Sequence, residues 1–195
     1  KNLLNSKSKI ITDEDNKQFN FIKNNINKKL ITIGSKSGTI KILDNHYNEN
    51  KQIIKIFMNS KIYNLEIPLI GYFQIKNLLM AILAAINSGL SKNKIFNKIH
   101  KIKSVPGRLE HVLTLKNNSY IIIDFAHTPD ALEQSLVSLK KQFKKDIILV
   151  FGCGGDRDKK KRFLMGKVAK KYCRKVFVTD DNPRSENPKK IREAI

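Results

Sequence analysis

The sequence predicts an α/β protein in which strands and helices alternate along the second half of the chain. Short apolar runs such as 121–123 and 147–151 have the length of buried strands, and longer segments with helix-forming residues separate them. Hydrophobic residues make up 41% of the 195 residues, which is enough for a packed core and too many for a disordered chain. No apolar run approaches the roughly 18 residues that would span a membrane.

The first hundred residues predict a mixed arrangement of strands and helices. The alanine-rich apolar run 75–86 predicts a buried helix that stops at Ser88-Gly89. A second helix is expected over 91–102, with Ser91 as its cap. β-forming runs separated by turn residues predict strands at 10–12, 30–33, 39–43, 53–58 and 62–67.

Val105-Pro106-Gly107 breaks the chain and predicts a domain boundary between 1–106 and 107–195. Beyond it, strands alternate with helices, which predicts a parallel sheet with helices on both faces. Asp130, with Glu133 three residues later, predicts a capping box at the start of one helix. The expected strands are 120–124, 147–151 and 176–179, and the expected helices are 130–142, 160–173 and one from Pro188 onward.

The chain is strongly basic, with 38 Lys+Arg against 17 Asp+Glu and a formal charge of +21. A nucleic-acid-binding protein would cluster this charge and interleave it with arginine or aromatic residues. Here lysine is spread over the whole chain, and the abundant lysine, isoleucine and asparagine share A/T-rich codons. We therefore interpret the charge as a solvated surface, with a basic nucleic-acid-binding module as the alternative and no specific nucleic-acid partner expected.

The two cysteines, Cys153 and Cys173, stand without the further cysteines or histidines of a disulfide framework or metal site. A reduced, cytoplasmic setting is expected for such a chain. The first ten residues contain no signal-peptide pattern. The chain also has no initiator Met, so we expect it to be a piece of a longer protein.

Three loops that directly follow predicted strands carry the candidate site residues, because ligands of parallel sheets bind at the carboxyl ends of the strands. In the loop 124–130, Asp124 can accept hydroxyl groups such as those of a ribose, and His127 can bind an anion or move a proton. The alternative is that Asp124 is a turn residue, Asp130 a helix cap and His127 a surface residue.

The other two loops carry glycine and arginine. Glycines in 152–162 allow backbone N–H groups to approach an anion, although neither a Walker A motif nor a complete G-x-G-x-x-G motif is present. A plain strand-to-helix turn is the alternative. In the loop 180–184, Arg184 stands out in a lysine-rich chain and suggests bidentate recognition of a carboxylate or phosphate. The alternative there is a solvated arginine.

Together these segments resemble the Mur ligases. The motifs that carry the resemblance are GYFQIKNLLMAILAA, GRLEHV, DFAHTPDAL, FGCGGDRDKKKRFLMG and VTDDNPRSENP, in this order between Gly71 and Ile195. The resemblance implies part of a central ATPase domain followed by an incomplete Rossmann-like C-terminal domain. It also implies that the family's P-loop lies before Lys1 and that this chain alone is inactive.

The implied activity is that of the family member that adds meso-diaminopimelate to UDP-MurNAc-L-Ala-D-Glu in peptidoglycan precursor synthesis. ATP phosphorylates the D-Glu carboxylate with the help of Mg²⁺, and the amine of the incoming residue attacks the acyl phosphate. A monomer is expected. Other ligases of the superfamily, such as those that add D-Glu, D-Ala-D-Ala or further glutamates to folate, are the nearest alternatives, and the GGDRDK and DNPR segments argue against them.

The resemblance also assigns roles to individual residues. His127 and a carbamylated Lys1 are implied catalytic residues, and the carbamate of Lys1 would help to bind Mg²⁺. The sequence departs from the family pattern at Gln74 (usually Asn), Phe125 (usually Tyr) and Lys160 (usually Gly). The implied ATP-binding residues are Gln74, Asn77, Arg108, Asp124 and His127, and the implied meso-diaminopimelate-binding residues are Arg157, Asp181, Asn182, Pro183 and Arg184.

Overall fold

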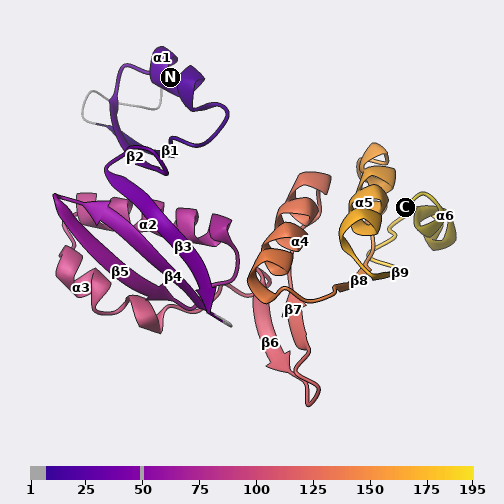
Figure 1. Cartoon of the computed structure of the whole chain (residues 1–195). Coiled ribbons are helices and arrows are strands. Elements are labelled where there is room, and N and C mark those ends of the chain that lie inside the picture. Colours follow the sequence, from indigo (N-terminus) through magenta and orange to yellow (C-terminus); the bar gives the residue numbers. More distant parts are fainter. Residues whose placement is uncertain (1–7, 49–50) are drawn as a thin grey trace. The chain divides into compact units, whose positions relative to one another are not determined.

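The computed structural model describes residues 8–48 and 51–195 (Figure 1). These residues form two compact units, which meet in the chain between Ser104 and Val105. Each unit has its own hydrophobic core. The units are described separately below.

A five-stranded sheet, β1-β2-β3-β4-β5, forms the first unit. β1 and β2 run parallel, as do β2 and β3, whereas β3, β4 and β5 are antiparallel neighbours. In β4, alternate residues from Gln52 to Met58 are buried, which is the period expected for a strand with one face on a core. The elements are β1 (Lys9–Asp13), α1 (Phe19–Asn25), β2 (Lys29–Gly34), β3 (Ile40–Asn48), β4 (Lys51–Met58) and β5 (Lys61–Ile67).

Helix α2 (Tyr72–Asn87) packs its apolar stripe into the core of this unit. The buried residues Ile75, Leu79, Ile82 and Leu83 follow helical spacing. The structure confirms the expected buried helix, which begins three residues earlier than predicted. The single helix expected over 91–102 is wrong: α3 (Lys92–Phe96) ends before Asn97, its C-cap, and a separate 3₁₀ turn, η1 (Ile99–Lys101), follows.

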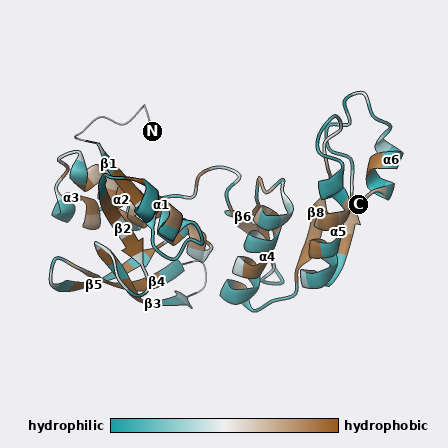
Figure 2. Cartoon of the chain, turned by 90° about the horizontal axis from the view of Figure 1, so that it is seen from above, coloured by the Kyte–Doolittle hydropathy of each residue, from teal (hydrophilic) through white to brown (hydrophobic). Residues whose placement is uncertain are grey.

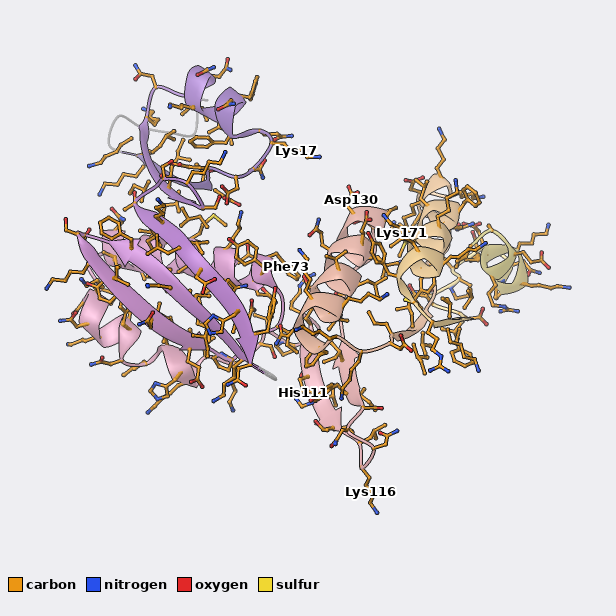
Figure 3. All side chains as sticks on the ribbon, viewed as in Figure 1. Lys17, Phe73, His111, Lys116, Asp130 and Lys171 are labelled. Atoms are coloured by element: carbon orange, nitrogen blue, oxygen red, sulfur yellow. The ribbon has the colours of Figure 1, made fainter. Side chains whose placement is uncertain are left out.

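The second unit contains two separate strand pairs and three helices. An antiparallel hairpin, β6–β7, precedes α4, with Lys116 at its turn (Figure 3). β8 and β9 pair in parallel, which confirms the expected parallel arrangement for these two strands. The elements are β6 (Glu110–Thr114), β7 (Tyr120–Ile123), α4 (Pro129–Phe143), β8 (Ile148–Phe151), α5 (Lys160–Tyr172), β9 (Lys175–Val178) and α6 (Pro188–Glu193).

The start of α4 differs from the predicted capping box. Thr128, not Asp130, is the N-cap, and its hydroxyl accepts a hydrogen bond from the Ala131 N–H. Pro129 occupies the first turn, where a missing N–H costs nothing. Glu133 does not reach back to the cap; it accepts a hydrogen bond from the Tyr172 hydroxyl of α5. This contact ties α4 to α5.

Candidate functional site

Two loops of the second unit, 152–159 and 179–187, follow the carboxyl ends of β8 and β9. Because these strands are parallel neighbours, their ends meet at one edge of the sheet. The Thr179 N–H donates to the Phe151 carbonyl at 2.9 Å and extends the pairing into the loops. The predicted glycine-rich loop and the DNPR segment are therefore adjacent.

Glycines let the two loop backbones approach more closely than side chains would allow. The Gly155 N–H donates to the Asn182 carbonyl at 2.9 Å. A Cβ atom at Gly155 would lie 1.8 Å from the Pro183 carbonyl oxygen, and one at Gly152 would lie 2.4 Å from the Thr179 carbonyl oxygen. The GCGG sequence therefore sets the position of the DNPR segment, because no larger residue fits at these points.

Arg184 is held by this close approach. Its Nη1 donates to the Gly155 carbonyl at 2.7 Å, and its backbone N–H donates to the Asn182 Oδ1 at 3.3 Å. Its φ of 51° is left-handed, which is uncommon for a residue other than glycine and is typical of over-determined functional segments. Within the described residues both side-chain hydrogen bonds of Arg184 come from Nη1. The rest of the exposed guanidinium can therefore meet a carboxylate.

A second arginine, Arg162 on α5, contacts both of these loops through Glu186 and the Gly154 carbonyl. Its side chain is 3% exposed and makes a bidentate pair with Glu186, with N···O distances of 3.0 and 2.8 Å. Glu186 Oε1 also accepts the Asp156 N–H at 2.7 Å. The hydrogen bonds from Arg162, followed by that from the Asp156 backbone, lower the pKa of Glu186 to about 2. Sequence reasoning missed this pair, although an arginine in a lysine-rich chain was the signal already used for Arg184.

Asp156 completes the connection between the two loops. Its carboxylate accepts the Ser185 hydroxyl at 2.7 Å and the Ser185 N–H at 3.2 Å. These hydrogen bonds lower the pKa of Asp156, so the carboxylate is ionised. The arrangement fixes Ser185, and hence the preceding Arg184, to the first loop.

The other predicted amino-acid-binding residues lie in these same loops. Asp181 and Asn182 are exposed, and Pro183 is half-buried against Gly155. Arg157 is exposed in the first loop, directly after Asp156. The structure thus brings the DNPR segment and the glycine-rich loop into one cluster.

Asp124, at the end of β7, holds the turn that carries Arg108. Its Oδ2 accepts the Leu109 N–H at 2.8 Å, and its Oδ1 accepts the Ala126 N–H and the Ser135 hydroxyl, each at 2.9 Å. A carboxylate offers about four acceptor sites. Three are used by the protein itself, so Asp124 has capacity for one further hydroxyl.

Arg108, Phe125 and His127 form an exposed group beside Asp124. The Arg108 guanidinium lies 5.6 Å from the Phe125 ring centroid, and the Phe125 and His127 rings meet edge to face at 5.7 Å. Lys161 of α5 donates to the His127 carbonyl at 2.8 Å. One cationic side chain thus lies over the Phe125 ring and another lies at the His127 backbone carbonyl. Cations of this kind suit a phosphate group.

In the first unit, the predicted nucleotide-binding residues Gln74 and Asn77 lie on α2. Gln52 positions the start of this helix from the sheet, because its buried amide donates to the Leu69 carbonyl at 2.8 Å and the Gly71 carbonyl at 3.0 Å. Lys1, the implied carbamylated lysine, lies outside the described residues.

Lys76, one residue before Asn77, is shared by two carboxylates. Its Nζ lies 2.8 Å from an Asp13 oxygen and 2.9 Å from an Asp15 oxygen. Burial disfavours the charged form, but the hydrogen bonds to Asp13 and Asp15 outweigh it and raise the pKa of Lys76. This contact ties α2 to the carboxyl end of β1.

Residues suited to Mg²⁺ do not gather in the described part of the chain, where no group of three His, Cys, Asp or Glu side chains could hold a metal ion. No helix among the described residues is long and apolar enough to cross a membrane.

Models of two ligase domains match the chain in sequence order. The Mur ligase middle domain matches residues 1–85, and the Mur ligase glutamate ligase domain matches residues 107–195. The chain belongs to the Mur ligase family. This finding agrees with the predicted family and fold class.

Curated Mur ligases resemble this chain closely over a limited part of their length. The UDP-N-acetylmuramoyl-L-alanyl-D-glutamate–2,6-diaminopimelate ligase of Rickettsia typhi is 42% identical over 190 residues, which are 95% of this chain and 38% of that protein. The same enzyme of Rickettsia montanensis is 40% identical over 95% of this chain and 39% of its own length. The chain thus spans about two fifths of these Mur ligases.

Solved structures give the same family. A UDP-N-acetylmuramoyl-L-alanyl-D-glutamate–2,6-diaminopimelate ligase matches with a TM-score of 0.62 and 30% identity, over 95% of this chain and 39% of that one. The folylpolyglutamate synthetase of Lactobacillus casei matches with a TM-score of 0.68 and 16% identity, over 94% of this chain and 47% of that one. The second likeness shows a shared Mur ligase fold and nothing about substrate.

Proposed function

We propose that this chain is part of an ATP-dependent ligase that adds meso-diaminopimelate to UDP-MurNAc-L-Ala-D-Glu during peptidoglycan precursor synthesis. Support comes from its relatives, whose names state this ligation, and from the loop cluster around Arg184. The observation that carries the proposal is the position of Arg184, an exposed residue that the two loops hold through its hydrogen bond to the Gly155 carbonyl.

The proposed reaction has three steps. ATP transfers its γ-phosphoryl group to the D-Glu carboxylate, the amine of the incoming residue attacks the acyl phosphate, and inorganic phosphate leaves while the amine loses a proton. Most of the catalysis in such a transfer is positioning and neutralisation of charge. We infer that Arg108 and Lys161 attract nucleotide phosphate, that His127 lies beside it, and that Asp124 accepts one ribose hydroxyl.

Recognition of the incoming amino acid belongs to the cluster formed by loops 152–159 and 179–187. Diaminopimelate differs from lysine by a carboxylate on its far carbon. A guanidinium can bind that carboxylate through two charge-assisted hydrogen bonds, and lysine offers no equivalent group. We assign the carboxylate to Arg184, with Arg157 beside it, and the distal ammonium to Asp181 and Asn182. Gln74 and Asn77 are proposed to contact adenine from α2.

Replacing Arg184 by Ala in the full-length ligase tests this assignment. We expect kcat/KM for diaminopimelate to fall, because the variant loses about 2–5 kcal/mol of transition-state stabilisation. This is the range for removing one partner of a charge pair that is buried once the substrate is bound. This corresponds to roughly 30- to 4,000-fold at about 1.4 kcal/mol per factor of ten. Turnover of lysine should change little.

The matched control is Arg174→Ala, because Arg174 is exposed at the opposite end of β9 and pairs only weakly with Asp146 at 3.4 Å. It should leave both substrates unaffected. Equal losses for diaminopimelate and lysine in Arg184→Ala would instead assign Arg184 to nucleotide binding and remove the support for diaminopimelate.

A further inference from the structure

Arg162 occupies a position on the core-facing side of α5. The buried residues of this helix are Arg162, Met165 and Ala169, which are three and four residues apart and therefore share one face. Met165 belongs to the hydrophobic core of the second unit. A charged side chain is almost never fully buried unless it is paired. The burial of Arg162 therefore depends on its partner, Glu186.

Stability alone does not explain this buried ion pair. Burying two charges costs solvation, and replacing such a pair by apolar residues of similar volume is often neutral or stabilising. The pairing is also incomplete, because the Arg162 Nε is buried and has no hydrogen-bond partner among the described residues. What the pair has and an apolar contact lacks is direction, since two parallel N–H···O bonds fix the position of the carboxylate.

Glu186 lies two residues after Arg184, and its hydrogen bonds fix the end of the turn that carries this arginine. The Glu186 N–H donates to the Pro183 carbonyl at 3.0 Å, which closes a four-residue turn over 183–186. The Glu186 carboxylate accepts the two hydrogen bonds from Arg162 and one from the Asp156 N–H. The last residue of the turn is thus bound both to α5 and to the glycine-rich loop.

The turn over 183–186 is held in an unfavourable backbone conformation. Arg184 has a φ of 51°, and so has Asp156, which contacts the turn from the other loop. Residues other than glycine rarely adopt this left-handed region, and they stay there only where their surroundings fix them. Some of the fixing contacts join Ser185 to the Asp156 carboxylate, and the others come from Glu186. Without the Glu186 contacts, the turn would relax and Arg184 would move.

The two cations beside Glu186 differ in their exposure to water. Figure 2 colours β8 as hydrophobic and the loop that leads to α6 as mostly hydrophilic, and Glu186 belongs to that loop. Lys159 lies on the solvent side, with its side chain 71% exposed and its Nζ 3.4 Å from Glu186 Oε2. Exposed ion pairs of this kind contribute little, because water competes for both partners. Arg162, which is buried and lies 2.8 Å from Glu186 Oε1, is therefore the partner that fixes the carboxylate.

We propose that Arg162 and Glu186 are positioning residues for the incoming amino acid: by fixing the turn over 183–186, they hold the Arg184 guanidinium where it meets the substrate carboxylate. Neither residue touches the substrate. They act through Arg184, so their loss should weaken binding of the amino acid and leave binding of ATP unchanged. This role rests on the proposed function, which assigns Arg184 to the incoming amino acid.

Steady-state kinetics of the full-length ligase test this role, with KM measured separately for the amino acid and for ATP. The double variant Arg162→Met/Glu186→Leu removes the hydrogen bonds of the pair without leaving a buried unpaired charge. We expect its KM for the amino acid to rise roughly 10- to 100-fold, the scale of a displacement of about 1 Å. Its kcat should stay within about two-fold of the wild type, because binding that is equal in the ground and transition states changes KM alone. Its KM for ATP should not change.

A merely structural role of the pair would give a different result. Partial unfolding lowers the concentration of active enzyme, which lowers the apparent kcat and leaves every KM unchanged. Thermal unfolding checks that the double variant is folded under the assay conditions. Lys159→Ala is the matched control, because it removes the exposed cation from the same carboxylate, and its kinetic constants should equal those of the wild type. If the double variant does not fold, Glu186→Gln takes its place, with an expected rise in the amino-acid KM of at least about 3-fold from the loss of a charge-assisted hydrogen bond.

The outcomes distinguish this role from the proposed function. An unchanged amino-acid KM in the double variant would overturn the positioning role, and so would an equal rise in KM for ATP. The wild-type enzyme is assayed with diaminopimelate and with lysine. If it accepts an amino acid other than diaminopimelate, the diaminopimelate assignment fails, and KM for the accepted amino acid then decides whether Arg162 and Glu186 position its binding site.

Discussion

Gly155 sets the distance between the loops that carry Arg157 and Arg184. Its hydrogen bond to Asn182 and the 1.8 Å separation between a Cβ at this position and the Pro183 oxygen leave no room for a side chain. The amino-acid site we propose therefore depends on a residue that has no side chain of its own to contribute.

Gly155→Ala should displace the DNPR segment. We expect a loss of about 1–3 kcal/mol in the free energy of unfolding, the usual cost of overpacking. Urea unfolding measures it. Lys116→Ala, at the exposed turn of the β6–β7 hairpin, is the control and should have little effect. An unchanged free energy of unfolding in Gly155→Ala would mean that loops 152–159 and 179–187 can move apart at no cost, so that Gly155 does not set their distance.

Glu186 makes the stability of the second unit depend on pH. Its pKa is lowered to about 2 by Arg162 and the Asp156 N–H, so it binds a proton more readily in the unfolded chain. The pair therefore stabilises the fold above pH 4.5, and this contribution is lost as the pH falls toward 2. Glu186→Gln should be less stable than the wild type at pH 7, and the difference should shrink by pH 3. Thermal unfolding at both pH values provides the measurement, and a constant difference would contradict the assigned pair.

Sequence reasoning identified Arg184 and missed Arg162, although both are arginines in a lysine-rich chain. Arg184 lies directly after a predicted strand, where ligands bind, whereas Arg162 lies in a predicted helix, where an arginine is commonly solvated. Its burial depends on Glu186, which is 24 residues away in the chain. Such a pair follows from the packing of α5 against the loop and cannot be inferred from local sequence.

At the scale of elements, the start of α4 shows that two neighbouring residues can both be suitable N-caps. Thr128 and Asp130 are both favoured N-cap residues, and Pro129 between them decides the outcome because it prefers the first helical position. Figure 3 shows Asp130 at this end of α4. The same limit explains why β6 was missed: its residues pair with β7 through a register shift that no local pattern indicates.

Replacing Thr128 by Ala should destabilise the second unit by about 1 kcal/mol, the usual cost of losing an N-cap. Asp130→Ala is the matched comparison, because Asp130 contributes through the helix dipole, worth about 0.3–1 kcal/mol. Chemical denaturation of both variants ranks them. A larger loss of stability for Asp130→Ala than for Thr128→Ala would indicate that Asp130 is the N-cap, as the sequence suggested.

At the scale of the whole molecule, the sequence predicted the α/β class, the main buried helix and the β8–β9 parallel pair. Regular apolar periodicity and strong stop signals made these elements predictable. The separation of β7 from β8 was not predicted, because strand order depends on contacts between distant segments. The short helix α1 was also missed, since none of its residues is buried and it shows no apolar stripe.

The charge of +21 also belongs to this scale. Lysines distributed over the surface should bind duplex DNA weakly and without sequence preference, and the binding should fall steeply with added salt. A titration of two unrelated duplexes at low and physiological salt tests this expectation. Tight binding at physiological salt that discriminates between the duplexes would favour the nucleic-acid-binding alternative.

Lys76 has a consequence for chemical labelling of this lysine-rich surface. Amine-acylating reagents attack the neutral amine, and Asp13 and Asp15 hold the Lys76 amine protonated and 16% exposed. Lys17, by contrast, is exposed (Figure 3). Limited acylation followed by mass spectrometry should therefore modify Lys17 early and Lys76 late, and Asp15→Asn should speed labelling of Lys76. The order of modification thus gives a chemical reporter of whether α2 is anchored to β1.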